Sequence, residues 1–114
     1  MLGKKNRLNK KKDFDNVFQK GKSFKEDFLI LKFCQKKSNQ IRFGFIVSQK
    51  VSRKATLRNK IKRRISELVR QRLEKSKKGL DVILIAVPGI ETKDFWEIEE
   101  SLNKLFKKSG IQNL

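Results

Sequence analysis

The chain has 114 residues and carries 30 Lys and Arg against 12 Asp and Glu, which gives a formal net charge of +18. Its single cysteine, Cys34, excludes an internal disulfide and a multi-cysteine zinc site, and the absence of histidine removes the usual general base and the usual metal ligand. The length fits one domain spanning 1–114, and no apolar run approaches the ~18 residues of a membrane helix, so we expect a cytoplasmic protein that does not bind membranes.

The positive charge is concentrated in the first two thirds of the chain. Residues 1–72 contain 23 basic and 5 acidic residues, whereas residues 73–114 contain 7 of each. An asymmetry of this size favours a defined binding surface for a polyanion over a uniformly charged surface that only keeps the protein soluble. The commonest polyanion partner is a nucleic acid, and we therefore expect one to bind here.

The N-terminal residues 1–9 are polar and basic, and they are predicted to form a mobile arm. From about Asn9 onward, Phe14, Val17 and Phe18 recur with the i, i+3, i+4 spacing of a short amphipathic helix. Gly21 follows, and a glycine just past the last turn is typical of a left-handed helix end. The prediction is a basic arm followed by one short helix.

Two segments rich in β-forming residues come next. Residues 28–34 are apolar apart from Lys32, and alternate positions of residues 41–48 are apolar, which is the pattern of a half-buried strand. A polar stretch at 36–40 separates the two segments, and we interpret it as the turn of a hairpin. A further short strand is predicted at 23–27.

The segment between Arg53 and Arg72 is the most basic part of the chain, with nine basic residues and a single acid, Glu67. Its apolar side chains follow the period of a helix and fall within an arc of ~120°. They are Leu57, Ile61, Ile65, Leu68 and Val69. Basic residues occupy both edges of this arc and the opposite side. We therefore predict a helix that packs one face on a sheet and presents a cationic ridge to the partner.

The last third of the chain reads as one strand and one helix. Residues 81–87 are apolar on both faces, which is typical of a central strand. A Pro-Gly pair ends the strand, and Thr92 is the predicted cap of a helix whose apolar stripe runs from Phe95 to Phe106. The predicted order is α-β-β-β-α-β-α. We expect an α+β two-layer sandwich with the helices on one face of a mixed four-stranded sheet.

No catalytic centre is evident in the sequence. The acidic residues are scattered, and neither a glycine-rich phosphate loop nor a nucleophile motif occurs. The basic helix offers mainly Lys and Arg, which hold phosphates without reading base edges. Phenylalanines interleaved with basic residues suit the stacking of single-stranded bases, although packing in the core is the alternative interpretation of each ring. These features favour RNA over duplex DNA as the partner.

Four segments of the chain, in this order and with this spacing, resemble those of a known family. They are Arg7-Leu8 with Phe14, Phe18 and Gly21; Ile41-Arg42-Phe43-Gly44-Phe45-Ile46-Val47 with Ser48 and Lys50; Lys54-Ala55 with Arg58-Asn59-Lys60-Ile61-Lys62-Arg63; and Asp81-Val82-Ile83-Leu84-Ile85-Ala86 with Leu105-Phe106-Lys107-Lys108. The family is the protein subunit of bacterial ribonuclease P, and the resemblance spans nearly the whole chain. Lys60 departs from the family's pattern, because it stands where the family usually has a second arginine, and lysine lacks the planar fork for bidentate phosphate contact.

The resemblance implies a function that the composition does not specify. In this family a large catalytic RNA uses Mg²⁺ to remove the 5′ leader from precursor tRNA. The small protein binds that RNA and holds the leader in a cleft between the sheet and the N-terminal helix. The chain would then be the non-catalytic subunit of a ribonucleoprotein endoribonuclease, present as a monomer within it. The resemblance also implies a left-handed β-α-β crossover, against the usual right-handed rule.

Carried over by position, the resemblance assigns two groups of residues. The residues expected to face the catalytic RNA are Arg53, Lys54, Arg58, Asn59, Lys60, Lys62 and Arg63. The residues expected at the leader cleft are Phe14, Phe18, Leu31, Phe33, Ser48 and Lys50. No metal-binding residue of the protein is expected, and Leu31 departs from the aromatic side chain expected at its position.

Two other functions are weighed against this one. A ribosomal or RNA-chaperone protein without a role in cleavage would explain the basic helix, but not its combination with the Phe14 and Phe18 helix. A nuclease acting alone is disfavoured by the missing catalytic residues. The observation that separates the three is whether the protein raises the cleavage of precursor tRNA by a catalytic RNA at low Mg²⁺.

Overall fold

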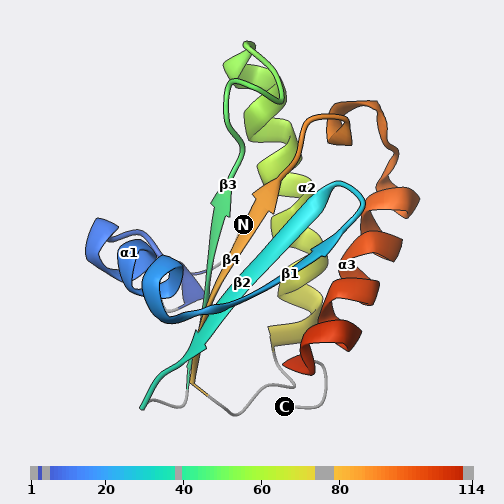
Figure 1. Ribbon diagram of the computed structural model, residues 1–114. Coiled ribbons are helices and arrows are strands. Elements are labelled where there is room, and N and C mark those ends of the chain that lie inside the picture. Colours follow the sequence, from blue (N-terminus) through green and yellow to red (C-terminus); the bar gives the residue numbers. More distant parts are fainter. Residues whose placement is uncertain (1–2, 4–5, 38–39, 74–78, 112–114) are drawn as a thin grey trace.

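The structure is a computed structural model that describes residues 3, 6–37, 40–73 and 79–111. This part of the chain forms four strands and three α-helices, with a short 3-10 helix before the last of them (Figure 1). In chain order they are α1 Lys11–Lys20, β1 Lys22–Glu26, β2 Leu29–Gln35, β3 Ile41–Ile46, α2 Ala55–Leu73, β4 Leu80–Ala86, η2 Ile90–Thr92 and α3 Phe95–Ser109. The α+β class and the predicted order of elements are confirmed. No described helix is long and apolar enough to cross a membrane.

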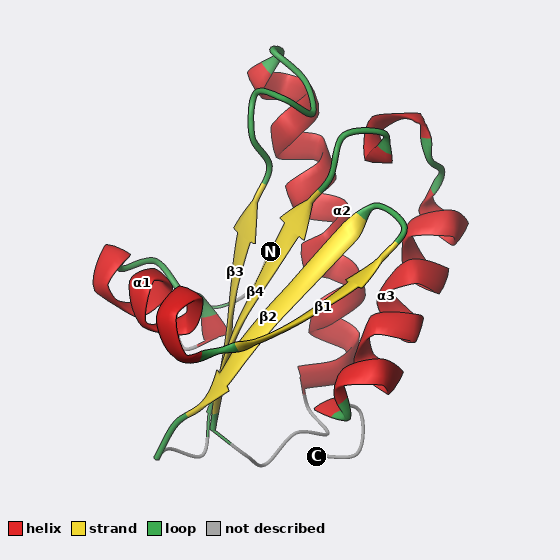
Figure 2. Cartoon of the chain, viewed as in Figure 1, coloured by secondary structure: helices red, strands yellow, loops and turns green. Residues whose placement is uncertain are grey.

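The four strands form one mixed sheet in the order β1-β2-β4-β3 (Figure 2). β2 pairs antiparallel with both β1 and β4, and β3 pairs parallel with β4. The predicted hairpin between the second and third strands is therefore wrong, since β4 lies between them. β4 takes this central place because its side chains are apolar on both faces, and a central strand is covered on both.

The connection from β3 through α2 to β4 is a left-handed crossover. In Figure 1 the two parallel strands point upward, β4 lies to the right of β3, and α2 passes behind the sheet. A right-handed connection would carry the helix in front of the sheet in this view. The crossover that the family resemblance implied is thus present.

Helices cover both faces of the sheet. α2 and α3 pack on one face, where Val82 and Leu84 of β4 join the main core. The intervening residue, Ile83, faces the other way. It forms a second, smaller cluster with Val17 of α1 and with Leu8, which precedes α1. Figure 1 shows α1 apart from the other two helices. The expectation that all helices share one face is therefore wrong for α1. Because β4 is apolar on both faces, α1 can pack on the face opposite α2 and α3.

Residues 6–8 are held against β3, an edge strand of the sheet. The N–H of Leu8 donates to the carbonyl of Phe43 at 2.8 Å, and the Leu8 side chain is buried. The predicted mobile arm is wrong for these residues, while residues 1–2 and 4–5 lie outside the described part of the chain. An edge strand offers unpaired backbone groups to any neighbouring segment, which the polar composition of the arm does not reveal.

α1 begins at Lys11, two residues later than predicted, and ends at Lys20, with Gly21 as its C-terminal cap. Gly21 has φ −80° and ψ 157°, so the predicted left-handed end is wrong. Glycine is nevertheless required there, because a Cβ atom would collide with the carbonyl oxygens of Val17 and Phe33. The missing side chain lets the end of α1 pass close to β2.

The last helix is capped by Asp94 and not by Thr92. Asp94 Oδ1 accepts the N–H of Glu97 at 2.9 Å, and Glu97 Oε1 accepts the N–H of Asp94 at 3.4 Å, which is a complete capping box. Thr92 ends the short 3-10 helix instead, where its hydroxyl donates to the carbonyl of Gly89 at 2.7 Å.

Candidate RNA-binding surfaces

The first candidate surface lies on α2 and the loop before it. All five predicted apolar positions of α2 pack in the main core, with Leu57 half-buried and the others buried, so the predicted amphipathic helix is confirmed. The basic side chains lie outside the core, either exposed or half-buried. We define the basic ridge as Arg53, Lys54, Arg58, Lys60, Lys62, Arg63 and Arg64.

The charge of the basic ridge is not compensated within the described structure. None of the ion pairs among the described residues includes a ridge residue, and Glu67, the acid of α2, pairs with Arg70 at 3.5 Å. The first turn of α2 contains no acidic residue. The positive end of the helix dipole therefore adds to the side-chain charges, and an external anion at this end interacts favourably with both.

Arg58 has a structural role besides the predicted contact with RNA. Its Nη1 donates to the carbonyls of Ser52 and Arg53 at 2.9 and 3.0 Å. Ser52 Oγ in turn accepts the N–H of Lys54 at 3.2 Å, where α2 begins. Arg58 thus shapes the loop, while its Nε and Nη2, which have no partner among the described residues, can still bind a phosphate.

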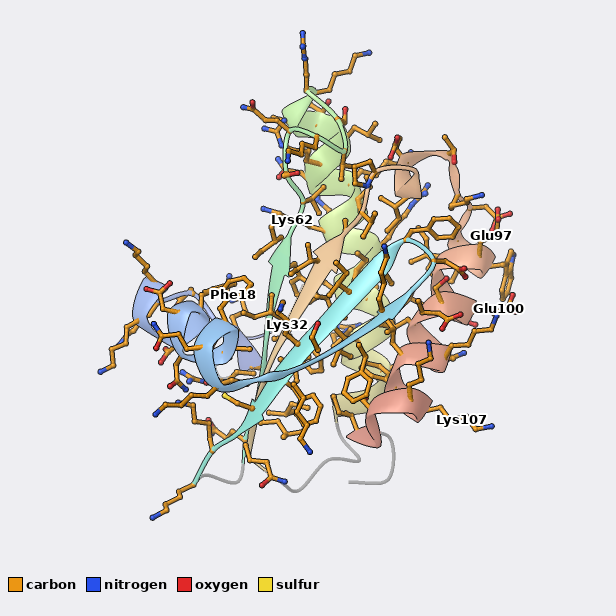
Figure 3. The ribbon with its side chains drawn as sticks, viewed as in Figure 1. Phe18, Lys32, Lys62, Glu97, Glu100 and Lys107 are labelled. Atoms are coloured by element: carbon orange, nitrogen blue, oxygen red, sulfur yellow. The ribbon has the colours of Figure 1, made fainter. Side chains whose placement is uncertain are left out.

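The second candidate surface is the part of the sheet beside α1. A row of half-buried isoleucines crosses three strands there, because Ile85 of β4 is in register with Ile30 of β2 and Ile46 of β3. Phe18 of α1 is 43% exposed, and Lys32 Nζ lies 5.6 Å from the centroid of its ring. Figure 3 shows these two side chains next to one another between α1 and the sheet. We define the open face as Phe18, Ile30, Lys32, Ile46 and Ile85.

The open face has the chemistry of a site for single-stranded RNA. An exposed aromatic ring offers a surface on which a base can stack, and a neighbouring lysine offers a charge to the phosphate. Phe14, the other aromatic residue predicted on α1, points inward instead. Its ring lies against Gly44, where a Cβ atom would collide with it. Phe14 is half-buried there, so Phe18 is the more exposed of the two rings of α1.

These two surfaces belong to a chain that matches one protein family over nearly its whole length. The model of the Ribonuclease P family matches residues 2–110. The chain belongs to the ribonuclease P family. A Ribonuclease P protein component from Clostridium botulinum (strain 657 / Type Ba4) is 41% identical over 111 residues, which cover 96% of this chain and 99% of that protein. Another, from Syntrophomonas wolfei, is 35% identical and covers 97% of this chain and 92% of the relative.

Solved structures of ribonuclease P proteins share the fold. The RNase P protein from Thermotoga maritima has a TM-score of 0.80 and 32% identity, over 90% of this chain and 96% of that one. The RNase P protein from Staphylococcus aureus has a TM-score of 0.81 and 32% identity, over 90% and 94% of the two chains. The family inferred from the sequence motifs is confirmed.

Two residues that the family resemblance assigned to the leader cleft lie on the opposite face of the sheet. Leu31 is fully buried in the main core, and Phe33 packs against the same core. The expectation that these two side chains lie between the sheet and α1 is wrong, because a shift of one residue exchanges the two faces of a strand. Ile30 and Lys32 face α1 instead. The sequence contained a signal for this, because Lys32 is the one charged residue of an apolar strand and marks its accessible side.

The other two predicted cleft residues, Ser48 and Lys50, are exposed in the loop that follows β3. Ser48 Oγ accepts the N–H of Lys50 at 3.3 Å, which shapes the turn. The loop begins just after Ile46, so it borders one end of the open face and leads from there to the basic ridge. In Figure 3 Lys62 of the ridge extends past β3 on the side where α1 lies, whereas Glu97 and Glu100 lie across the molecule on α3.

Proposed function

We propose that the basic ridge binds the catalytic RNA of ribonuclease P, while the open face holds the 5′ leader of precursor tRNA for its endonucleolytic removal. The observation that carries this proposal is the presence of two adjoining surfaces of unlike chemistry. The ridge suits the phosphates of a folded RNA, and the open face suits the bases of an unpaired strand. The loop of Ser48 and Lys50 connects them, so a leader on the open face would lie next to the catalytic RNA.

In this proposal the chemical step belongs to the RNA, which uses Mg²⁺. Within the described ranges, no three His, Cys, Asp or Glu side chains gather to hold a metal ion. Two carboxylates near α1, Asp13 and Asp81, both bind Arg42. The protein contributes binding and orientation of the leader, together with positive charge beside the RNA.

The RNA-free protein is expected to hydrolyse no RNA, and to raise the rate at which the catalytic RNA cleaves precursor tRNA at low Mg²⁺. The physical reason is that the basic ridge supplies cations that the assembled RNAs otherwise take from solution. The measurement is cleavage of end-labelled precursor across a Mg²⁺ titration, with and without protein. Cleavage by repurified protein alone would refute the division of roles. An unchanged RNA rate would favour the RNA-chaperone alternative.

Phe18→Ala should weaken binding of precursor tRNA to the assembled ribonucleoprotein by about 1–3 kcal/mol, the usual contribution of a base–aromatic stack. Affinity for mature tRNA should stay the same, because mature tRNA has no leader. Phe14→Ala is the matched control on the same helix, and it should instead cost about 3 kcal/mol of stability, since the Phe14 ring packs inside. If Phe18→Ala weakened the binding of precursor and mature tRNA equally, the open face would not be the leader site.

A further inference from the structure

A network of charged side chains joins α1 to the sheet. Arg42 of β3 and Asp81 of β4 are register partners, and they form two parallel hydrogen bonds, Nε to Oδ1 at 2.9 Å and Nη2 to Oδ2 at 2.8 Å. The third nitrogen of the guanidinium group, Nη1, donates to Asp13 Oδ2 of α1 at 3.4 Å. Lys36 Nζ lies 3.8 Å from Asp81 Oδ2. One arginine therefore bridges a strand and a helix.

The network is organised around a buried carboxylate. The side chain of Asp81 is 1% exposed, that of Asp13 13% and that of Arg42 31%. A buried carboxylate requires fixed partners, and the bidentate arginine pair is strongly directional. The hydrogen bonds with Asp81 raise the pKa of the Arg42 guanidinium above its ordinary value. The sheet thus holds Arg42 in place, and its remaining nitrogen is aimed at one position of α1.

The other contacts between α1 and the sheet are mainly apolar. Val17 is fully buried and Phe14 packs beside it. Asn16 Nδ2 adds a long hydrogen bond of 3.6 Å to Cys34 Sγ. Apolar packing determines how closely the helix approaches the sheet, whereas the hydrophobic effect itself has no direction. The contact from Arg42 adds a charge-assisted, directional restraint to this packing.

Rotation of α1 would displace Phe18. At 100° per residue, Asp13 lies about 40° to one side of Val17, and Phe18 lies about 100° to the other side. A rotation that carries Asp13 away from Arg42 therefore moves the Phe18 ring relative to the row of isoleucines. The contact between Arg42 and Asp13 opposes such a rotation.

We propose that the Asp13–Arg42–Asp81 network sets the spacing of the open face, so that Asp13 and Arg42 are positioning residues for the leader without touching it. This inference rests on the proposed function of the open face. Breaking the bridge should weaken binding of the leader. It should not weaken binding of the catalytic RNA, because the basic ridge lies on α2 and the loop before it, and no hydrogen bond or ion pair of the described residues joins it to the network.

The experiment compares Asp13→Asn with Asp15→Asn in the full-length protein assembled with its catalytic RNA. Both substitutions remove one negative charge from α1, but Asp15 is exposed and belongs to no ion pair among the described residues. The measured quantity is the ratio of the Kd values for mature and precursor tRNA. Asp13→Asn should lower this ratio roughly three- to tenfold, the size of a coupling carried by a packed network, and Asp15→Asn should change it by less than about twofold. Asp13→Glu, which keeps the charge, should recover most of the ratio.

Two readouts distinguish positioning from general damage. Catalytic-RNA affinity and the unfolding midpoint should be nearly the same for the Asp13→Asn and Asp15→Asn proteins. Equal Kd ratios for these two variants would overturn the proposal, and so would a loss of affinity by Asp13→Asn that is the same for precursor, mature tRNA and catalytic RNA. If the unsubstituted protein did not discriminate precursor from mature tRNA at all, the leader site itself would be wrong, and the positioning role with it.

Discussion

Affinity for the catalytic RNA is expected to fall steeply with salt, with log K decreasing linearly against log salt at a slope of roughly −4 to −5. About six of the ridge residues can face one RNA surface, and each neutralised phosphate contributes about −0.7 to −0.9 to the slope. Between about 50 and 200 mM salt, the affinity should drop roughly 250- to 1000-fold. Titration of labelled catalytic RNA with protein at several salt concentrations measures this directly.

Two single substitutions test whether the basic ridge is the source of that slope. Arg63 is exposed on the ridge, and Arg63→Ala should reduce the magnitude of the slope by about 0.7–0.9. Lys107 is also exposed, but it lies on α3 across the molecule from α1 (Figure 3), so Lys107→Ala should leave the slope unchanged. A slope near zero for the parent protein, or equal changes in both variants, would show that the ridge charge is not what binds RNA.

Arg42→Ala is expected to lower the free energy of unfolding by about 3–5 kcal/mol, because it removes the bidentate partner of a buried carboxylate. Among the described residues, Asp81 would keep the ion pair with Lys36, whose Nζ lies 3.8 Å from Asp81 Oδ2. The whole stability of a domain is about 5–15 kcal/mol, so the variant should lose a large share of it. Urea unfolding followed by circular dichroism provides the measurement.

A second substitution shows whether the buried charge is the cause. Adding Asp81→Asn to Arg42→Ala should recover part of the lost stability, since an uncharged amide is less costly to bury than an unpaired carboxylate. Arg42→Lys should cost less than Arg42→Ala, because it keeps the charge but not the planar fork. A loss below about 1 kcal/mol for Arg42→Ala would mean that the pair does not anchor the sheet. Asp81 would then not hold Arg42 rigidly enough for Arg42 to orient α1.

The sequence by itself determined the features that depend on residues close together along the chain. The basic ridge is one of them, because the apolar arc and the charges of α2 both follow from the period of a single helix. The exposed surface of α2 could therefore be predicted without knowing what α2 packs against. The family could be recognised for a related reason, since its motifs are short runs such as Arg58-Asn59-Lys60.

Only the tertiary structure decided which side of a strand meets which helix. Apolar residues on both faces of β4 show that it is central, but not which strands flank it, so the hairpin expected between β2 and β3 was wrong. Which residues of β2 face α1 depends on register, and an error of one residue led to the expectation that Leu31 faces α1, where the structure has Ile30. The bridge from Arg42 to Asp13 joins residues 29 positions apart in the chain. It exists because β4 brings Asp81 beside Arg42 and leaves its other face open to α1, and no local pattern contains that information.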